Sequence, residues 1–175
     1  MFTRNRRRRA FTLVELILVV IMLGLLAAIV IPKFASGRQD AGEAALKQNL
    51  KVLRTAIQRY FHHHNGVYPA AAAAGDGNGE AGTAAAFINQ LAKYTDVLGA
   101  ASDTQDATHV FGPYLKTGIP VSSVGTISGK SDVKVVIVNG LTPDKSTGWL
   151  YSTVTGEFVA NTDELSSEDT AYNNW

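Results

Sequence analysis

The sequence predicts an α+β fold, in which one long N-terminal helix packs its second half against a small antiparallel β-sheet head. Three observations carry this prediction. An otherwise apolar run extends from Phe11 to Ile31, and a helical repeat of apolar residues continues beyond it. Short β-branched and aromatic runs, separated by glycine, then follow from Val133 onward, as is typical of strands joined by turns.

The charges are unevenly distributed along the chain. Five of the 16 basic residues stand in the first nine positions, whereas all 15 acidic residues lie from Glu15 onward. Without its first ten residues the chain carries 11 basic and 15 acidic side chains, a net charge of −4. A body of that sign argues against a nucleic-acid partner. There is no cysteine, so an exported fold relies on packing, assembly or a metal instead of disulfides.

The first 32 residues predict a basic leader, residues 1–10, followed by a membrane-spanning half-helix, residues 11–32. The run from Phe11 to Ile31 has 21 residues, about enough to cross ~30 Å of hydrocarbon as a helix. Arg4 and the four arginines from Arg6 to Arg9 favour a cytoplasmic N-terminus, with the remainder exported. An ordinary cleaved secretory signal is a poorer explanation, because its apolar region is usually about 7–15 residues long. A plain uncleaved anchor is a further alternative.

Glu15 is a carboxylate inside this apolar run. An ionised carboxylate in a membrane helix costs roughly 2.5–3.5 kcal/mol on insertion scales, so its presence calls for a partner or a role.

Ala10 to Leu16, AFTLVEL, resembles the cleavage and methylation signal of type IV pilins and of type II secretion pseudopilins, and the likeness continues through Gly24 to Pro32. The resemblance implies that prepilin peptidase cuts between Ala10 and Phe11 and that Phe11 is then N-methylated. Ala10 stands where the family usually has glycine. The resemblance also implies that Glu15 neutralises the new amine of a neighbouring subunit during filament assembly. Pairing removes the penalty of two isolated charges in lipid, so Glu15 is an assembly residue and not a catalyst.

Gly24 and Pro32 predict a kink in the helix, because proline removes a backbone hydrogen bond and clashes with the preceding turn. In filaments of the resembled family the matching segment loses helicity. A gentle kink that only eases packing is the alternative.

Residues 33–65 are predicted to be the amphipathic half of the same helix. The apolar positions recur at spacings of four and three and are Leu46, Leu50, Leu53, Ile57 and either Tyr60 or Phe61. The basic residues between them, Lys47, Lys51, Arg54 and Arg59, are predicted to form a solvated face. Asn65-Gly66 predicts the end of the helix. The consecutive residues His62, His63 and His64 point in different directions, which predicts a solvated or capping role instead of a metal site.

Residues 66–132 are predicted to be rich in loops. Ala70 to Ala86 predicts a flexible surface loop, followed by a short helix from about Thr83 to Tyr94 with Phe87, Ile88 and Leu91 inward. Gly112 to Leu115, GPYL, resembles a stretch of the major pseudopilin of type II secretion.

Residues 133–175 are predicted to form an antiparallel sheet with an acidic C-terminal segment. The strands are expected at Val133–Val138, Gly148–Val154 and Glu157–Ala160. The candidate contacts to the helix are Val135, Ile137, Trp149, Tyr151 and Phe158. Residues 161–175 carry four acidic and no basic side chains, which predicts a solvated tail. The alternative is a loop ordered by calcium, since major pseudopilins bind calcium near their C-terminal strands; no ligand is assigned, and no other cofactor is expected.

These expectations describe a structural filament subunit and not an enzyme. The sequence has no Gly-x-Ser-x-Gly elbow, no cysteine nucleophile and no paired-histidine metal motif. The resemblance favours a type II secretion pseudopilin. A type IV pilin of an adhesion or motility pilus is the alternative, followed by a membrane-anchored periplasmic binding head.

The partners implied by the resemblance are identical or related pilin subunits, prepilin peptidase, and an inner-membrane assembly platform with its ATPase. The expected location is the inner membrane, crossed once, with a periplasmic head that assembles into a periplasmic or extracellular filament.

Overall fold

The computed structural model describes residues 11–75 and 77–175, and of residues 29–36 it describes the main chain alone. The predicted leader, residues 1–10, lies outside this part. The chain divides into two units, Met1–Gln39 and Asp40–Trp175, and each is described by itself.

A single helix, α1 (Leu13–His63), contributes residues to both units. In the first unit the apolar side chains of residues 11–28 are exposed, with Phe11 at 80% and Leu25 at 64%. Gly24 and Pro32 both fall within α1, and the kink stays a prediction. Residues 29–32 of the predicted membrane-spanning segment have side chains outside the described part.

Within the described residues, no helix combines the length and the apolar character that crossing a membrane requires.

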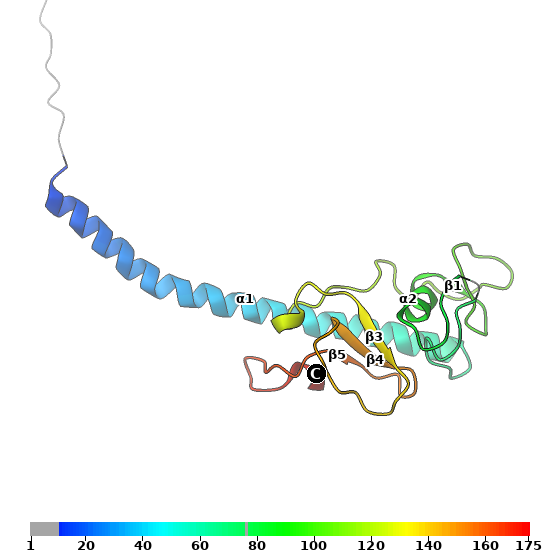
Figure 1. Ribbon diagram of the computed structural model, residues 1–175. Coiled ribbons are helices and arrows are strands. Elements are labelled where there is room, and N and C mark those ends of the chain that lie inside the picture. The colour runs from blue at the N-terminus through cyan, green and yellow to red at the C-terminus, as the bar shows by residue number, and fades with distance from the viewer. Residues whose placement is uncertain (1–10, 76) are drawn as a thin grey trace, which may run out of the picture. The chain divides into compact units, whose positions relative to one another are not determined.

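The second unit is built on the amphipathic half of α1, as predicted. One row of its side chains is at most 2% exposed and consists of Leu46, Leu50, Leu53, Ile57 and Tyr60. Burying a side chain such as Leu53 stabilises the fold by about 1.5–3 kcal/mol. Figure 1 shows α2 and the strands β3, β4 and β5 gathered along this part of α1. The helix ends as expected, with Asn65 and Gly66 both at positive φ, 55° and 80°.

The alanine-rich segment after α1 is held in place, contrary to the predicted flexible surface loop. Ala70 and Ala74 are fully buried. The cause is the buried amide of Gln90 in α2 (Ala84–Ala92), which accepts from the Ala70 amide at 2.6 Å and donates to the Gly99 carbonyl at 3.0 Å. Thr83 caps α2 by accepting from the Ala86 amide at 3.2 Å. The short helix is therefore confirmed within its predicted bounds.

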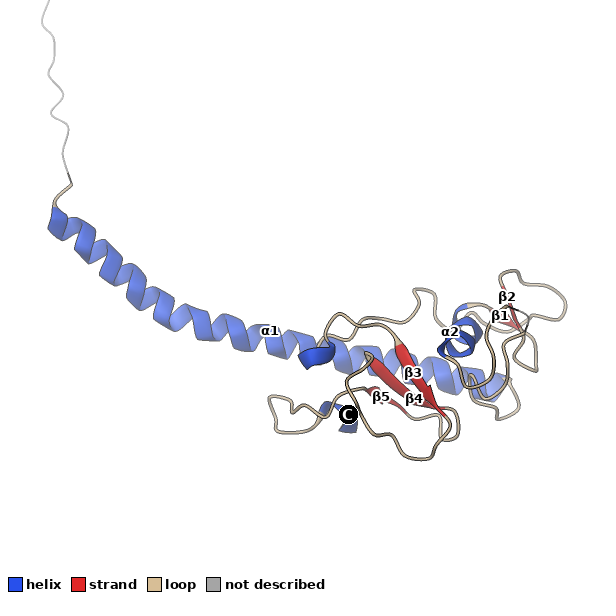
Figure 2. Cartoon of the chain, in the orientation of Figure 1, coloured by secondary structure: helices blue, strands red, loops and turns tan. Residues whose placement is uncertain are grey.

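In the described part of the chain five strands form two small sheets, which confirms the α+β class (Figure 2). The pair β1 (Tyr94–Thr95) and β2 (Ala101–Ser102) is antiparallel. The three-stranded sheet contains β3 (Val133–Val136), β4 (Trp149–Ser152) and β5 (Phe158–Ala160), in that order.

One strand direction differs from the antiparallel prediction. β4 and β5 are antiparallel, but β3 and β4 are parallel, with Val133 opposite Trp149. The segment between β3 and β4, on the order of a dozen residues, is long enough for the crossover that a parallel pair needs. Trp149, Tyr151 and Phe158 are buried as predicted, and Val135 packs on the core. Ile137 is 69% exposed because β3 ends before it, so its predicted contact with the helix is wrong.

The C-terminal segment is folded onto the head and is not a solvated tail. Asn161 is buried and donates to Asp144 Oδ1 at 2.7 Å, while Asp163 pairs with Lys145 at 2.7 Å. Glu164 accepts from the Thr126 hydroxyl at 2.6 Å. Two of the acidic side chains on which the predicted solvation rested therefore bind specific partners on the head.

A buried carboxylate of α1, Glu43, holds the same segment. Its oxygens accept from the Ser167 amide at 2.8 Å, the Ser167 hydroxyl at 2.7 Å and the Tyr172 hydroxyl at 3.0 Å. Glu43 is only 6% exposed, so these bonds compensate for its lost hydration. Side-chain contacts to α1 thus order the C-terminal segment.

His64, just after α1, is buried instead of solvated. Its ring stacks on Tyr60 with centroids 3.7 Å apart. Nδ1 donates to the Tyr60 carbonyl at 2.8 Å, so the predicted capping role holds, and Nε2 meets Thr95 Oγ1 at 3.0 Å. Burial lowers the pKa of His64; hydrogen bonds with the Tyr60 and Asp96 main chains and the Asp96 charge oppose the shift, while His63 adds to it.

We predict that the head loses stability as the pH falls below about 6.5, the ordinary pKa of histidine. Because the unfolded chain then binds a proton that folded His64 takes up only at lower pH, the free energy of unfolding decreases through this range. Chemical denaturation of the full chain in detergent between pH 5 and 8 measures the slope. His64→Phe should flatten it, and the exposed control His62→Phe should keep it. An unchanged slope in His64→Phe would contradict the prediction.

Candidate functional site

The start of α1 is closed by a reciprocal cap between Thr12 and Glu15. The Thr12 carbonyl accepts the first helical hydrogen bond, from the Leu16 amide at 3.2 Å. The Thr12 hydroxyl accepts from the Glu15 amide at 3.2 Å, and Glu15 Oε2 accepts from the Thr12 amide at 2.9 Å. This is the capping box expected of a threonine followed three residues later by glutamate.

The cap fixes where the Glu15 carboxylate lies. Oε2 also accepts from the Thr12 hydroxyl at 2.9 Å, so both donors of Thr12 converge on one oxygen. Among the described residues, Oε1 of Glu15 accepts no hydrogen bond. A negative charge in the first turn also complements the positive end of the helix. The arrangement therefore holds an exposed carboxylate three residues from Thr12 with one oxygen open to a further cation.

Sequence reasoning predicted Glu15 but missed Thr12. The signal was present, since Thr12-Leu13-Val14-Glu15 has the capping-box spacing. The structure places Phe11 immediately before this cap, whereas Ala10 lies outside the described residues. Gly24 and Pro32 lie further along α1 and take no part in the cap.

Apart from Glu15, the exposed side chains of α1 over residues 13–28 are apolar on all sides. Leu13, Val14, Leu16 and Ile17 are each at least 48% exposed. A helix that is apolar all round is normally covered by protein or lipid, and a large exposed apolar surface marks an interaction site. This part of α1 can thus bury itself in a membrane or among other helices.

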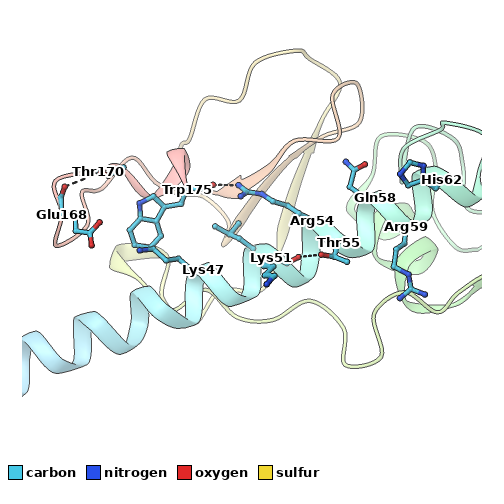
Figure 3. Close-up of a pocket in the computed structure, with 11 residues that line it drawn as sticks. Lys47, Lys51, Arg54, Thr55, Gln58, Arg59, His62, Glu168, Thr170 and Trp175 are labelled. Atoms are coloured by element: carbon cyan, nitrogen blue, oxygen red, sulfur yellow. Dashed lines mark hydrogen bonds between the residues drawn. The ribbon is translucent and has the colours of Figure 1, made fainter.

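A second feature is a groove along α1 in the second unit, bordered by the C-terminal segment (Figure 3). Its lining comprises Lys47, Leu50, Lys51, Arg54, Thr55, Gln58, Arg59, His62, Glu168, Thr170 and Trp175. We call it the basic groove, because four of these side chains are lysine or arginine and one is a carboxylate.

Two side chains of α1, Arg54 and Lys47, shape the basic groove through their contacts. Arg54 is half-buried and donates through Nε to the Phe158 carbonyl at 2.9 Å and through Nη2 to the main-chain oxygen of Trp175. Lys47 Nζ lies 4.2 Å from the centre of the Trp175 ring, a cation–π distance. Burial lowers the pKa of the Arg54 guanidinium, and the charge of Glu157 opposes this shift. The predicted solvated face is therefore partly covered by the C-terminal segment.

The described residues contain no group of three or more His, Cys, Asp or Glu side chains placed to hold a metal ion. Calcium binding stays a prediction from the resemblance.

Comparison with known proteins concerns the N-terminal third. Residues 5–31 match the model of the prokaryotic N-terminal methylation motif. Over 57 residues, 33% of this chain, the sequence is 46% identical to the type IV major pilin protein PilA of Myxococcus xanthus, covering 26% of that protein. It is 35% identical over 57 residues to the type II secretion system core protein G of Pseudomonas aeruginosa, covering 33% of this chain and 40% of that protein.

The core protein G of Aeromonas hydrophila is 29% identical over 62 residues, 35% of this chain and 43% of that protein. The matched part of the chain thus spans less than half the length of these curated relatives. No solved structure gives a significant match. The N-terminal segment is type IV pilin-like, which confirms the resemblance carried by Ala10 to Leu16.

We predict that Thr12→Val loosens the first turn of α1, because valine keeps the shape of threonine but lacks the capping hydroxyl. Loss of such a cap costs about 1 kcal/mol, or roughly fivefold in local opening. Hydrogen exchange at the Glu15 amide, measured on the full chain in detergent micelles, should rise accordingly. Thr12→Ser retains the hydroxyl and should exchange like the wild type. Equal protection in all three chains would show that the cap contributes nothing.

Proposed function

We propose that this chain is a structural subunit of a type IV pilus-like filament, and specifically a type II secretion pseudopilin that polymerises through its N-terminal helix. The observation that carries the proposal is the matched methylation motif over residues 5–31. The motif coincides with the exposed apolar start of α1 and with the capped carboxylate of Glu15.

Processing is the first step of the proposed mechanism. Prepilin peptidase removes residues 1–10 by cutting after Ala10, and Phe11 receives the methyl group on its new amine. This amine is a cation adjacent to Thr12, whose own amide donates to Glu15 Oε2 at 2.9 Å. The nitrogen of Phe11 is part of a peptide bond in the uncleaved chain, so it carries this positive charge only after cleavage.

Assembly then places the amine of an incoming subunit against Glu15 of a subunit already in place. Thr12 occupies Oε2 of Glu15, so Oε1 is the oxygen that faces the new cation. In an apolar environment each charge is costly alone and their pairing offsets both penalties, which selects a correctly staggered neighbour. The exposed apolar residues of α1 pack among the helices of other subunits. No catalytic chemistry is needed.

Before assembly, the subunit resides in the inner membrane, with residues 11–32 in the bilayer, the N-terminus cytoplasmic and the head periplasmic. An assembly platform and its cytoplasmic ATPase extract it into the filament.

A pilin of an adhesion or motility pilus is the second candidate, and the 46% identity to the Myxococcus xanthus pilin favours it. Two core proteins G among the relatives, together with the Gly112 to Leu115 stretch, favour the secretion role.

Deleting the gene for this chain separates the two roles. We expect secreted proteins to accumulate in the periplasm of the deletion strain, because the secretion machine lacks its filament, while surface attachment and twitching stay normal. Quantitative proteomics of medium and periplasm, alongside a motility assay, measures both. Restored export on returning the wild-type gene is the control. Loss of motility with normal export would assign the chain to a pilus.

Glu15→Leu should abolish filament assembly without preventing processing. Leaving one partner of a buried ion pair unpaired costs about 3–5 kcal/mol, so the yield of sheared filaments should fall by at least about tenfold. Membrane-bound, cleaved subunit should persist, with Phe11 as its first residue by mass spectrometry. Glu80→Leu, which removes an exposed carboxylate from the head, is the matched control. Normal filament yield from Glu15→Leu, or a mature N-terminus other than Phe11, would refute the mechanism.

A further inference from the structure

Three of the four cations of the basic groove have no acidic side chain as a partner among the described residues. In the part of the chain that the structure describes, no Asp or Glu side chain forms an ion pair with Lys47, Lys51 or Arg59, whereas Arg54 donates to the Trp175 oxygen. Lys47 and Lys51 are also four residues apart on α1, a spacing at which like charges repel. An accumulation of unpaired positive charge on one helix face therefore needs a counter-charge from elsewhere.

The basic residues elsewhere in the same unit are mostly neutralised. Lys93 pairs with Asp103 at 3.0 Å, Lys134 with Asp144 at 2.6 Å and Lys145 with Asp163 at 2.7 Å. Between Asp40 and Trp175 the sequence has nine basic and 14 acidic side chains, a net charge of −5. Since four of the nine bases line the basic groove, the rest of this unit is strongly acidic.

The basic groove of one copy is thus complementary in charge to the acidic remainder of the head on another copy. We propose that the basic groove docks the acidic surface of a second copy of this chain. The inference rests on the proposed filament role and adds a head-to-head contact to it. A groove on one copy and a different surface on the next make a heterologous contact, which propagates into a helical filament instead of closing as a dimer.

The groove is organised before any partner arrives. Arg54 is anchored to the Phe158 carbonyl at 2.9 Å, and Lys47 lies 4.2 Å from the centre of the Trp175 ring. Arg59 lies against Tyr114, its guanidinium carbon 5.9 Å from the ring centre. These contacts limit the motion of the three side chains, which reduces the entropy lost when an acidic surface docks.

Zero-length carbodiimide cross-linking of the full chain tests the proposal, because it joins lysine amines only to carboxylates in contact. Unlabelled and nitrogen-15-labelled chains are mixed equally, and mass spectrometry identifies cross-links that join two copies. We expect Lys47 and Lys51 to exceed the exposed control Lys116 in such cross-links by about fivefold or more, as for a complementary charged interface. The cross-links should decline in about 1 M salt, where the Debye length is only about 3 Å.

Two variants make the test independent of folding. Lys51→Glu should remove the cross-links at Lys47, whereas Lys116→Glu, with the same change in net charge, should keep them; equal protease resistance of the two variants establishes that both are folded. Equal cross-linking at Lys47, Lys51 and Lys116, or links within single copies only, would overturn the proposal. Acetylation of Lys47 and Lys51 can also be compared with and without phosphatidylglycerol vesicles. If only the vesicles protect these two lysines, the groove binds lipid and the proposal is overturned.

The outcome is separable from that of the proposed function. Filament yield is scored in the same cells. Intermolecular cross-links at the groove in a chain that makes no filaments would retain this inference and refute the filament role, whereas filaments without such cross-links would do the reverse.

Discussion

The head depends on the burial of one apolar row on α1. Leu46, Leu50, Leu53, Ile57 and Tyr60 are almost fully removed from solvent, and they share one buried cluster with residues of α2 and of the three-stranded sheet. A helix of this amphipathic pattern is unstable alone in water, because most helical stability in proteins comes from packing of the apolar face. Short strands and long loops cover this row, so regular secondary structure makes up only a small part of the cover.

Buried polar groups compensate for that lack of regular structure. Gln90 supplies hydrogen bonds to the alanine-rich segment, Glu43 to the C-terminal segment and His64 to the end of α1. Each would be costly to bury without partners, so each accepts or donates at specific main-chain or hydroxyl groups. The loops are therefore ordered by a few directional contacts instead of by continuous ladders.

The features predicted correctly from sequence depend on local pattern. The spacing of four and three located the buried row of α1, Asn65-Gly66 located its end, and β-branched runs located β3, β4 and β5 to within a few residues. The capping box is equally local, because Thr12 and Glu15 stand three residues apart, although the sequence predictions considered only the charge of Glu15.

The errors concern contacts between distant residues. Strand direction in β3 depends on how the chain crosses over before Trp149, which no short pattern encodes. The burial of His64 depends on Thr95, and the order of the C-terminal segment depends on Glu43. Composition alone had suggested a solvated tail, because it cannot reveal a partner more than a hundred residues away.

The anchoring of the C-terminal segment on α1 has a consequence for the order in which the chain is made. Residues 43–54 emerge from the ribosome early, but Glu43 and Arg54 find Tyr172 and Phe158 only after separations of 129 and 104 residues. Contacts at such separations slow folding. Until the last strand and the final loop arrive, the apolar row of α1 stays without its full cover. The head is therefore completed only after Tyr172 has been synthesised, and apolar surface exposed before that point favours aggregation.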